Sequence, residues 1–444
     1  MDRRGSIVVV VMVAGLLAGC GSASEVLPAP PVSSASATPD VPSPSEEASP
    51  SASAVVSGTV YPDLTSAPVG AWVTVYGIDS AVASWPVVSH GNARTVVRVP
   101  KGAQSLMVGG HRVEVRVRPG RVVVVDPSSL RAAVTGLRPG DTVYLRTGTY
   151  AGHYDDAGWN EANIVLDHGG TKDRPVALVA YPGEHPKLVN TGVGSGGRPN
   201  FYLSAGPGRV ASWVTIAGLS MVAEPASIYG GGNTADSSTP ESGAAHVRVV
   251  GCRLAITDAH SNTGTGIVSI QGDGWQVLGN TFVDPVGRDI INNNHGIYIQ
   301  NGADDVEIAH NTLTGLHMGH TIQIHQDGTP MVYSNIRIHH NRIAGKRRDD
   351  QRGITVSNVA DASTVVIEHN TIATVGQGFG AVTIYRGKVR VEANAISAVN
   401  GPAIMLNGGY GGHRSVIYGA NKTSGVDSAV VAVNGASAAE ARRS

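Results

Sequence analysis

Residues 306–313 read VEIAHNTL, and this phrase decides the fold because its pattern returns along the second half of the chain. The pattern is apolar-x-apolar-x-x-Asn-x-apolar. Its further copies are WQVLGNTF (275–282), IRIHHNRI (336–343), VVIEHNTI (365–372) and VRVEANAI (389–396). An earlier copy, VRVVGCRL (247–254), has Cys252 at the asparagine position, and successive copies lie 24 to 31 residues apart. Repeats of this length are typical of solenoids, in which each repeat packs only on its neighbours.

A second short segment with alternating apolar residues lies between the copies of this phrase. It reads GIYI (296–299), TIQI (321–324), GITV (353–356), AVTI (381–384) and AIML (403–406). Each coil therefore carries at least two strands, and coils stacked about 4.8 Å apart would form parallel sheets around one core. Two columns are expected to point inward: Ile297, Ile322, Ile354, Val382 and Ile404, and Ile299, Ile324, Val356, Ile384 and Leu406.

The asparagine column is predicted to be structural. Stacked side-chain amides in a turn can bond to the coils above and below, and Cys252 would be a small buried filler in the same column. The position before it carries a second column: Gly251, Gly279, His310, His340 and His369. These histidines could form a metal ladder, but a turn position inherited by every repeat is the simpler interpretation.

Two further phrases join the repeats in resembling a known family. They are LRPGDTVYLRTGTY from Leu137 and RPVALVAYPGEHPKL from Arg174, and the resemblance to the pectate-lyase-like superfamily runs from about Asp126 to Gly425. It implies an all-β chain whose body, residues 126–433, is a right-handed parallel β-helix (solenoid). A short helix at LRAAVTGL (130–137) would cap it, and residues 434–444 would be a flexible tail. This fold hosts lyases, hydrolases, epimerases and non-enzymes.

The segment before the solenoid, residues 58–125, is rich in strand-forming residues. Its phrase APVGAWVTVYG (67–77) resembles the opening of an immunoglobulin-like TIG module. We expect a small β-sandwich-like domain with an accessory role, as a spacer or as a sugar-contact module.

The N-terminus carries a secretion signal. Arg3 and Arg4 precede an apolar run, residues 7–17, that is too short to span a bilayer. The run ends in LAGC (17–20), which resembles the lipobox of bacterial lipoproteins and implies acylation of Cys20. Residues 21–57 are rich in Ser, Pro and Ala and are predicted to be a disordered tether. We therefore expect a secreted protein, lipid-anchored to the outer face of the bacterial membrane, with no other membrane contact and no disulfide.

Composition limits the partners. The formal net charge is -1, so the chain lacks the basic excess of a nucleic-acid binder. With 57 glycines and 3 phenylalanines, it favours short strands and tight turns over an aromatic helical core. We expect a monomer whose partner is a polysaccharide substrate or glycan.

The two strand faces differ in outward chemistry. On the asparagine phrase the outward positions mix both charge signs with apolar residues, which predicts a solvated face. The second strand instead presents planar and hydrogen-bonding groups: His295, His320 and Arg352 at its entry, then Tyr298, Gln300, Gln323, His325, Tyr385 and Arg386. Irregular insertions at 224–245, 255–265, 283–294 and 345–351 enter just before this strand, so we expect them to wall a groove.

Such a groove suits a sugar chain. Tyrosine covers the apolar face of a pyranose, amides and imidazoles bond its hydroxyls, and Arg352 or Arg386 could hold a uronate carboxylate. For β-elimination, His295 or His320 would be the base, Tyr298 or Tyr385 would donate to the leaving oxygen, and Arg352 would neutralise the carboxylate. Gln300, Gln323 and His325 would contact substrate. A histidine at a strand entry is more often a turn residue that bonds the backbone, and this is the simpler interpretation of each of these histidines.

Calcium is the cofactor to consider, since many relatives use it to bridge substrate carboxylates. Asp284, Asp289 and Asn292 to Asn294 supply oxygen ligands, although no fixed-spacing loop is present. The paired aspartates of polygalacturonase-type hydrolases, the Asp-Pro-His run of alginate epimerases and the arginine-proline signature of the main pectate lyases are all missing. The leading hypothesis is a cell-surface polysaccharide lyase-like enzyme acting on uronate-containing polysaccharide; the alternative is a non-catalytic glycan-binding or adhesin-type surface lipoprotein.

Overall fold

The computed structural model describes residues 60–102, 105–151, 162–190, 199–204, 209–223, 226–231, 243–256, 266–284, 295–316, 319–344, 352–373, 380–397 and 401–444. These residues belong to one compact unit, Ala52–Ser444. The predicted signal, Cys20 and the tether lie outside them and stay predictions. No helix within these ranges is long and apolar enough to cross a membrane.

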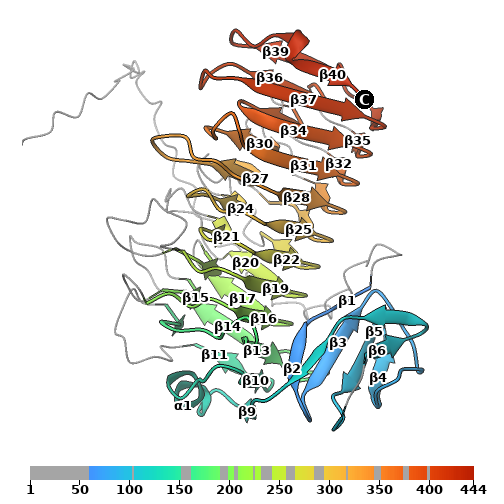
Figure 1. Cartoon of the computed structure of the whole chain (residues 1–444), viewed down its shortest axis with the longest axis vertical. Coiled ribbons are helices and arrows are strands. Elements are labelled where there is room, and N and C mark those ends of the chain that lie inside the picture. The colour runs from blue at the N-terminus through green and yellow to red at the C-terminus, as the bar shows by residue number, and fades with distance from the viewer. Residues whose placement is uncertain are drawn as a thin grey trace, which may run out of the picture. The chain divides into compact units, whose positions relative to one another are not determined.

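The body of the chain is a right-handed parallel β-helix with three strands in each coil, one more than the two recognised in the sequence (Figure 1). Sheet 1 has twelve strands, formed by the asparagine phrases and their equivalents: β9 (Val122–Val125), β10 (Thr142–Leu145), β13 (Val176–Ala180), β16 (Val214–Ala217), β19 (Val247–Val250), β22 (Gln276–Leu278), β25 (Glu307–Ala309), β28 (Ile336–His339), β31 (Thr364–Glu368), β34 (Gly387–Glu392), β37 (Arg414–Gly419) and β40 (Ala441–Arg443).

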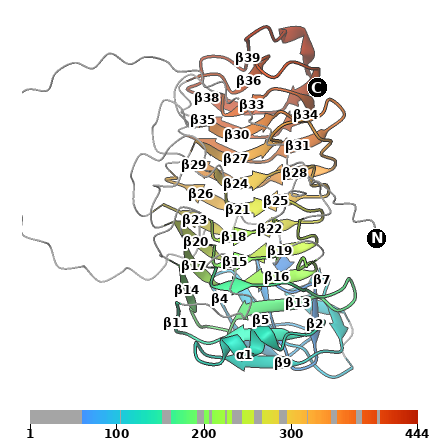
Figure 2. The ribbon, with the colours of Figure 1, turned by 90° about the vertical axis from the view of Figure 1, so that its left-hand side faces the viewer.

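Sheets 2 and 3 have ten strands each. Sheet 2 follows the asparagine turn and contains β11 (Thr149–Tyr150), β14 (Lys187–Asn190), β17 (Ser220–Ala223), β20 (Arg253–Ile256), β23 (Thr281–Val283), β26 (Thr312–Thr314), β29 (Arg342–Ala344), β32 (Thr371–Ala373), β35 (Ala395–Ser397) and β38 (Lys422–Ser424). Sheet 3 contains β12 (Ile164–Val165), β15 (Phe201–Tyr202), β18 (Ile228–Tyr229), β21 (Gly266–Ile270), β24 (His295–Ile299), β27 (His320–His325), β30 (Arg352–Ser357), β33 (Val382–Ile384), β36 (Ile404–Asn407) and β39 (Val430–Val433). Figure 2 shows the sheet 3 strands as successive rungs.

The inward columns predicted from the second strand are confirmed. Ile297, Ile322 and Ile354 are consecutive Cα partners across β24, β27 and β30, and all three side chains are fully buried. Burying one branched side chain per strand per coil removes apolar surface from water along the whole axis. The core is therefore continuous, as stacking requires.

The asparagine column forms a ladder of side-chain amides. Nδ2 of Asn311 donates to Oδ1 of Asn341 at 3.0 Å, and Nδ2 of Asn341 donates to Oδ1 of Asn370 at 3.0 Å. Each amide also donates to a carbonyl oxygen of the preceding coil. Cys252 begins the column as a buried free thiol whose pKa burial raises to about 12, as expected of a packing residue. The structural interpretation of this column is confirmed.

The capping helix of the solenoid lies where the sequence predicted it, but both predicted boundaries differ. Strand β9 (Val122–Val125), expected in the small domain, pairs in parallel with β10 of sheet 1. Helix α1 (Leu130–Thr135) lies at the start and buries Leu130 and Val134. At the other end, the structure places strand β40 where a flexible tail was expected, because Val416–Tyr418 in β37 offer an open parallel edge that Ala441–Arg443 pair with. A 3-10 turn, η2 (Ala438–Glu440), precedes it.

In the small N-terminal domain, the regular secondary structure of the described residues is all β-strand. It has an antiparallel sheet of β1 (Tyr61–Pro62), β3 (Trp72–Tyr76), β5 (Arg94–Arg98) and β4 (Val87–Gly91), with two further pairs: β2 (Ser66–Pro68) with β8 (Arg116–Arg118), and β6 (Leu106–Val108) with β7 (His111–Val113). Its identity as a TIG module stays a prediction.

This domain covers part of the outer face of sheet 1, which corrects one expectation. The outward residues Val250, Leu278 and Ala309 were assigned to a solvated face, but they are buried in a cluster shared with Tyr61 and Tyr76 of the domain. The physical reason is that three apolar residues in one column form a patch, and the domain removes that patch from water.

Candidate functional site

The entry residues of three sheet 3 strands lie in register. His295 begins β24, His320 begins β27 and Arg352 begins β30, and they are consecutive Cα partners. Residues 25 to 57 apart in the sequence thus become neighbours on one wall because coils stack without offset. This is the arrangement on which the sequence hypothesis depended.

Six rings form a continuous series across this wall, here called the ring series. His320 and His295 have ring centroids 5.1 Å apart, and His295 and Tyr298 are 4.6 Å apart. The series continues from Tyr298 to His325 at 6.5 Å, from His325 to Tyr410 at 5.8 Å, and from Tyr410 to Tyr385 at 5.0 Å. Five of the six residues were predicted from the sequence, and Tyr410 was not.

Most of the ring series is buried, including Tyr385 and His320 at its two ends, whereas the ring of Tyr410 is exposed. His295 and Tyr298 are 4 % and 3 % exposed, and Tyr410 is 47 % exposed. The described side chains at the strand entries therefore do not line an open groove as expected, because their rings pack against one another. Most residues of the insertions expected to wall the groove lie outside the described ranges.

Burial keeps the side chains of His295 and Tyr298 uncharged, with a free lone pair on the imidazole and a proton on the phenol. Desolvation lowers the pKa of His295 to about 3, so its imidazole is neutral at pH 7. Desolvation raises the pKa of Tyr298, so its phenol keeps its proton. Nδ1 of His295 is buried with no hydrogen-bond partner among the described groups. A proton acceptor and a proton donor thus lie side by side.

His325 is held by groups on both sides of its ring. Its Nε2 lies 3.2 Å from Oδ1 of Asp327 and donates to that carboxylate. Its Nδ1 lies 3.1 Å from Oγ of Ser357, and Nε2 of Gln323 donates a hydrogen bond to this Oγ at 3.2 Å. These contacts orient the ring of His325 toward Tyr298 and Tyr410. His320 is similarly held, with Nδ1 2.9 Å from Oγ1 of Thr355.

The remaining predicted residues are placed less centrally. Nε and a terminal nitrogen of Arg386 donate to Oδ1 of Asp361 at 3.0 and 2.9 Å, so this guanidinium already has a carboxylate partner. Gln300 directly follows β24, and its backbone N–H donates to the carbonyl of Ile270. For Arg352 the structure describes the backbone position only.

Only one of the predicted calcium ligands lies within the described residues. Asp284 follows β23 and is described, but Asp289 and Asn292 to Asn294 lie outside the described ranges. The set stays a prediction.

Tyr410 and Asp327 are the site residues that sequence reasoning missed. Tyr410 is the single aromatic residue in the stretch GGYGGH (408–413), and a large ring among glycines is a signal that could have been used. Asp327 follows β27 by two residues and contributes only through its contact with His325, which no repeat pattern encodes.

A hollow of about 330 Å³ lies elsewhere, between the small domain and sheet 1. Its lining includes Arg116, Lys172, Trp213, His246 and Arg248. The rings of Trp213 and His246 stack at 3.9 Å, and Arg248 donates to the carbonyl of Pro62 and to Gln276. This hollow was not predicted from the sequence.

No family model matches the chain, and no curated protein matches its sequence. Several solved structures are similar in fold. The chain aligns with a variant of the PL6 family alginate lyase AlyGC (16% identity, TM-score 0.41) over 70% of its own length and 40% of that protein's. It aligns with a mannuronic acid-specific family 6 polysaccharide lyase from human gut microbiota (15%, 0.40) over 70% and 83%. It aligns with the pectate lyase Pel9A (13%, 0.38) over 71% and 78%.

Proposed function

We propose that this right-handed parallel β-helix is a carbohydrate-active enzyme that cleaves uronate-containing polysaccharide by β-elimination at the ring series. The observation that carries the proposal is the contact between His295 and Tyr298, whose rings lie 4.6 Å apart. The imidazole is neutral and can accept a proton, and the phenol keeps a proton that it can donate. Elimination needs such a pair, a base for one proton and an acid for another.

The reaction balances with these two groups. The neutral imidazole of His295 removes the C5 proton of a uronate, and the electron pair moves toward the carboxylate as an enolate. The enolate then forms the C4–C5 double bond and expels the glycosidic oxygen from C4. The Tyr298 phenol protonates that oxygen, and the proton returns from His295 to the phenolate through solvent. Arg352, next in register after His320, would neutralise the substrate carboxylate.

Substrate charge would help the base. Imidazole with a pKa near 3 accepts protons weakly, but an anionic uronate beside it favours the protonated form and raises that pKa. Desolvation by the bound sugar strengthens this effect, because charges interact more strongly when water is excluded. The exposed ring of Tyr410 would cover one sugar face, and Gln323 and His325 would bond hydroxyls.

Hydrolysis fits this wall less well. Glycosidases use two carboxyl groups on either side of the scissile bond. The carboxylates described beside the ring series are Asp327 and Asp361, and they are engaged by His325 and Arg386.

A glycan-binding surface protein without catalysis is the second candidate. It is favoured by the burial of His295 and Tyr298, which leaves Tyr410 as the accessible ring. In both cases we place the protein outside the cell, as a monomer anchored through acylated Cys20, with a glycan as its partner.

The test is incubation of the purified chain with polymannuronate, polyguluronate, polygalacturonate and a glucuronan, with and without added Ca²⁺, while the ultraviolet absorbance of unsaturated uronate is followed. The proposal expects a steady increase with one polymer, lost in His295→Gln and kept in His185→Gln, an exposed histidine between β13 and β14. Absence of the signal with every polymer would remove the lyase; retained binding of a polymer in that case would favour the second candidate.

A further inference from the structure

The turn between sheets 1 and 2 carries a stack of rings that starts in the small domain. Tyr76 and Tyr61 stack at 5.4 Å, and Tyr61 stacks on His310 at 5.6 Å. The stack continues to His340 at 5.1 Å and to His369 at 5.0 Å. The three histidines have φ of 58°, 54° and 55°, in the left-handed region that Gly251 and Gly279 occupy in earlier coils. The column is therefore a turn position, as expected.

His339 adds a further imidazole to this turn, and its ring lies at right angles to the stack. Its ring makes 86° with that of His310 and 84° with that of His340. Nδ1 of His339 lies 3.0 Å from Nδ1 of His340. One ring nitrogen from each of His310, His339 and His340 lies within 4.8 Å of the others.

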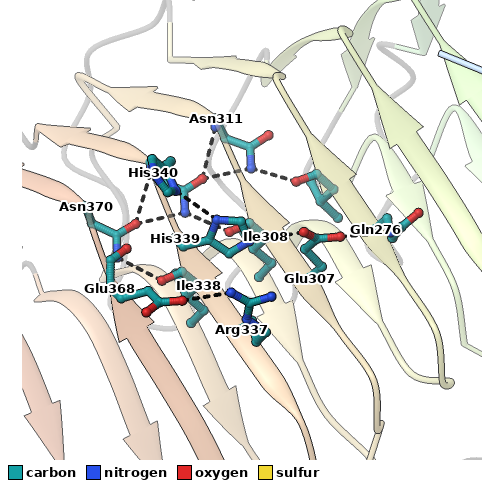
Figure 3. Close-up of polar contacts among 12 residues, drawn as sticks. Gln276, Glu307, Ile308, Asn311, Arg337, Ile338, His339, His340, Glu368 and Asn370 are labelled. Carbon is teal, nitrogen blue, oxygen red and sulfur yellow. Dashed lines mark hydrogen bonds and ion pairs between the residues drawn. The ribbon is translucent and has the colours of Figure 1, made fainter. Parts of the chain in front are cut away.

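A carboxylate prepares His339 to act as a ligand. Its Nε2 lies 3.1 Å from Oε1 of Glu307 and must donate, since the carboxylate only accepts (Figure 3). The pKa of Glu307 is lowered mainly by this hydrogen bond, so the carboxylate is charged. In the neutral ring the lone pair is then on Nδ1, which faces His340. Metal-binding histidines are oriented by carboxylates in the same way.

His310 supplies a second prepared nitrogen. Its Nδ1 is buried and has no hydrogen-bond partner among the described groups. A buried imidazole nitrogen that no described group occupies is available to bind a metal ion.

We propose that His310, His339 and His340 bind one divalent transition-metal ion of the zinc type through their ring nitrogens, with water completing the coordination. With bonds of about 2.0–2.1 Å, two nitrogens on one ion are about 3.0–3.4 Å apart, so the His339–His340 pair already has the required separation. Small side-chain rotations would bring in His310. The ion would join two successive coils at the point where Tyr61 reaches the solenoid. Carboxylate and water sites suit Ca²⁺ better, so this site is distinct from a calcium site.

The experiment is calorimetric titration of the full chain, stripped with chelator, with ZnCl₂ at pH 7.5. We expect one ion per chain, and a more than tenfold loss of affinity in His339→Gln and in His310→Asn, which keeps a residue tolerant of the left-handed turn. His369→Asn is the matched control, since it alters the same turn one coil further and should leave affinity unchanged. Equal loss in His369→Asn would overturn the ligand set, and no binding by the unaltered chain would overturn the site.

A second readout does not depend on the variants' folding. Cu²⁺ added at one equivalent to the unaltered chain should give an electron paramagnetic resonance spectrum with coupling to several imidazole nitrogens. Coupling to a single imidazole nitrogen in the unaltered chain would refute the three-histidine site.

Discussion

The hydroxyl oxygen of Tyr61 occupies the space that a Cβ atom on Gly279 would need. Tyr76 lies over Gly251 in the same way, one coil earlier. The turn column therefore changes from glycine to histidine where the small domain ends: glycine accepts a tyrosine from the domain, and beyond Tyr61 histidine continues the ring stack. This relationship ties the small domain to the register of the solenoid.

Substituting Gly279 should uncouple the small domain. In Gly279→Ala the added methyl overlaps Tyr61 and sits at φ of 63°, so we expect a loss of about 2–4 kcal/mol in the free energy of unfolding. Denaturant unfolding measures it. Gly328→Ala is the control, because φ there is 80° but nothing lies within 4 Å, so it should cost only about 1 kcal/mol. If the two variants lose equal stability, the overlap with Tyr61 has no energetic role.

Breaking the amide ladder in its middle should be costly. Asn341→Ala removes the acceptor of the Asn311 backbone and side-chain N–H groups and the donor to the carbonyl of Ile308. Buried groups left without partners cost about 1–3 kcal/mol each, so we expect a loss of roughly 3 kcal/mol by thermal or denaturant unfolding. Asn421→Ala at the less buried end of the ladder should cost less than half as much. A larger cost at Asn421 than at Asn341 would contradict this account.

Removing one hydroxyl should separate catalysis from binding. Tyr298→Phe keeps the ring contacts with His295 and His325 but removes the proton for the leaving oxygen. We expect kcat to fall at least 100-fold with KM changed less than threefold, measured by the absorbance of the unsaturated product. Tyr410→Phe is the matched control, and it should retain most of kcat. An active Tyr298→Phe variant would assign the acid to another group.

Stability should fall in mild acid because histidines are buried as neutral rings. The pKa values of His295 and His310 are lowered to about 3 and about 4, against about 6.5 in the unfolded chain. Their contribution is fully present above pH 6.5 and is lost as the pH falls from 6.5 toward 4 for His310 and toward 3 for His295, since the unfolded state then binds more protons. We expect a slope on the order of 1 kcal/mol per pH unit for each ring.

The measurement is denaturant unfolding at pH 7.5, 6, 5 and 4. His295→Gln should lower the slope in this range, whereas His185→Gln should not, because His185 is exposed. A slope that is the same in His295→Gln and in the unaltered chain would show that His295 is not buried as a neutral ring.

The periodic features of the sequence were sufficient for the solenoid. Each copy of the phrase, such as VRVEANAI, supplies inward-facing apolar residues and one turn asparagine. Successive copies therefore add one residue per coil to each column. The register that places His295, His320 and Arg352 together follows from the same repeat. Stacking preserves such columns because each coil contacts only its neighbours.

Side-chain orientation and long-range docking could not be obtained in this way. No periodicity indicates that His325 meets Asp327 on one side and Tyr410 on the other, or that His339 joins His310 and His340. The apolar column of Val250, Leu278 and Ala309 was visible in the sequence, but its meaning depended on the domain that covers it.

By itself, the sequence determined an all-β parallel solenoid with an asparagine ladder and the set of residues facing outward from its second strand. Only the tertiary structure decided which of those residues are buried, which rings touch, and that Tyr61 fills the space above Gly279. The reason is physical: repeat register is a local property of the chain, whereas burial and ring contacts depend on how segments more than 200 residues apart, such as Tyr61 and Gly279, pack together.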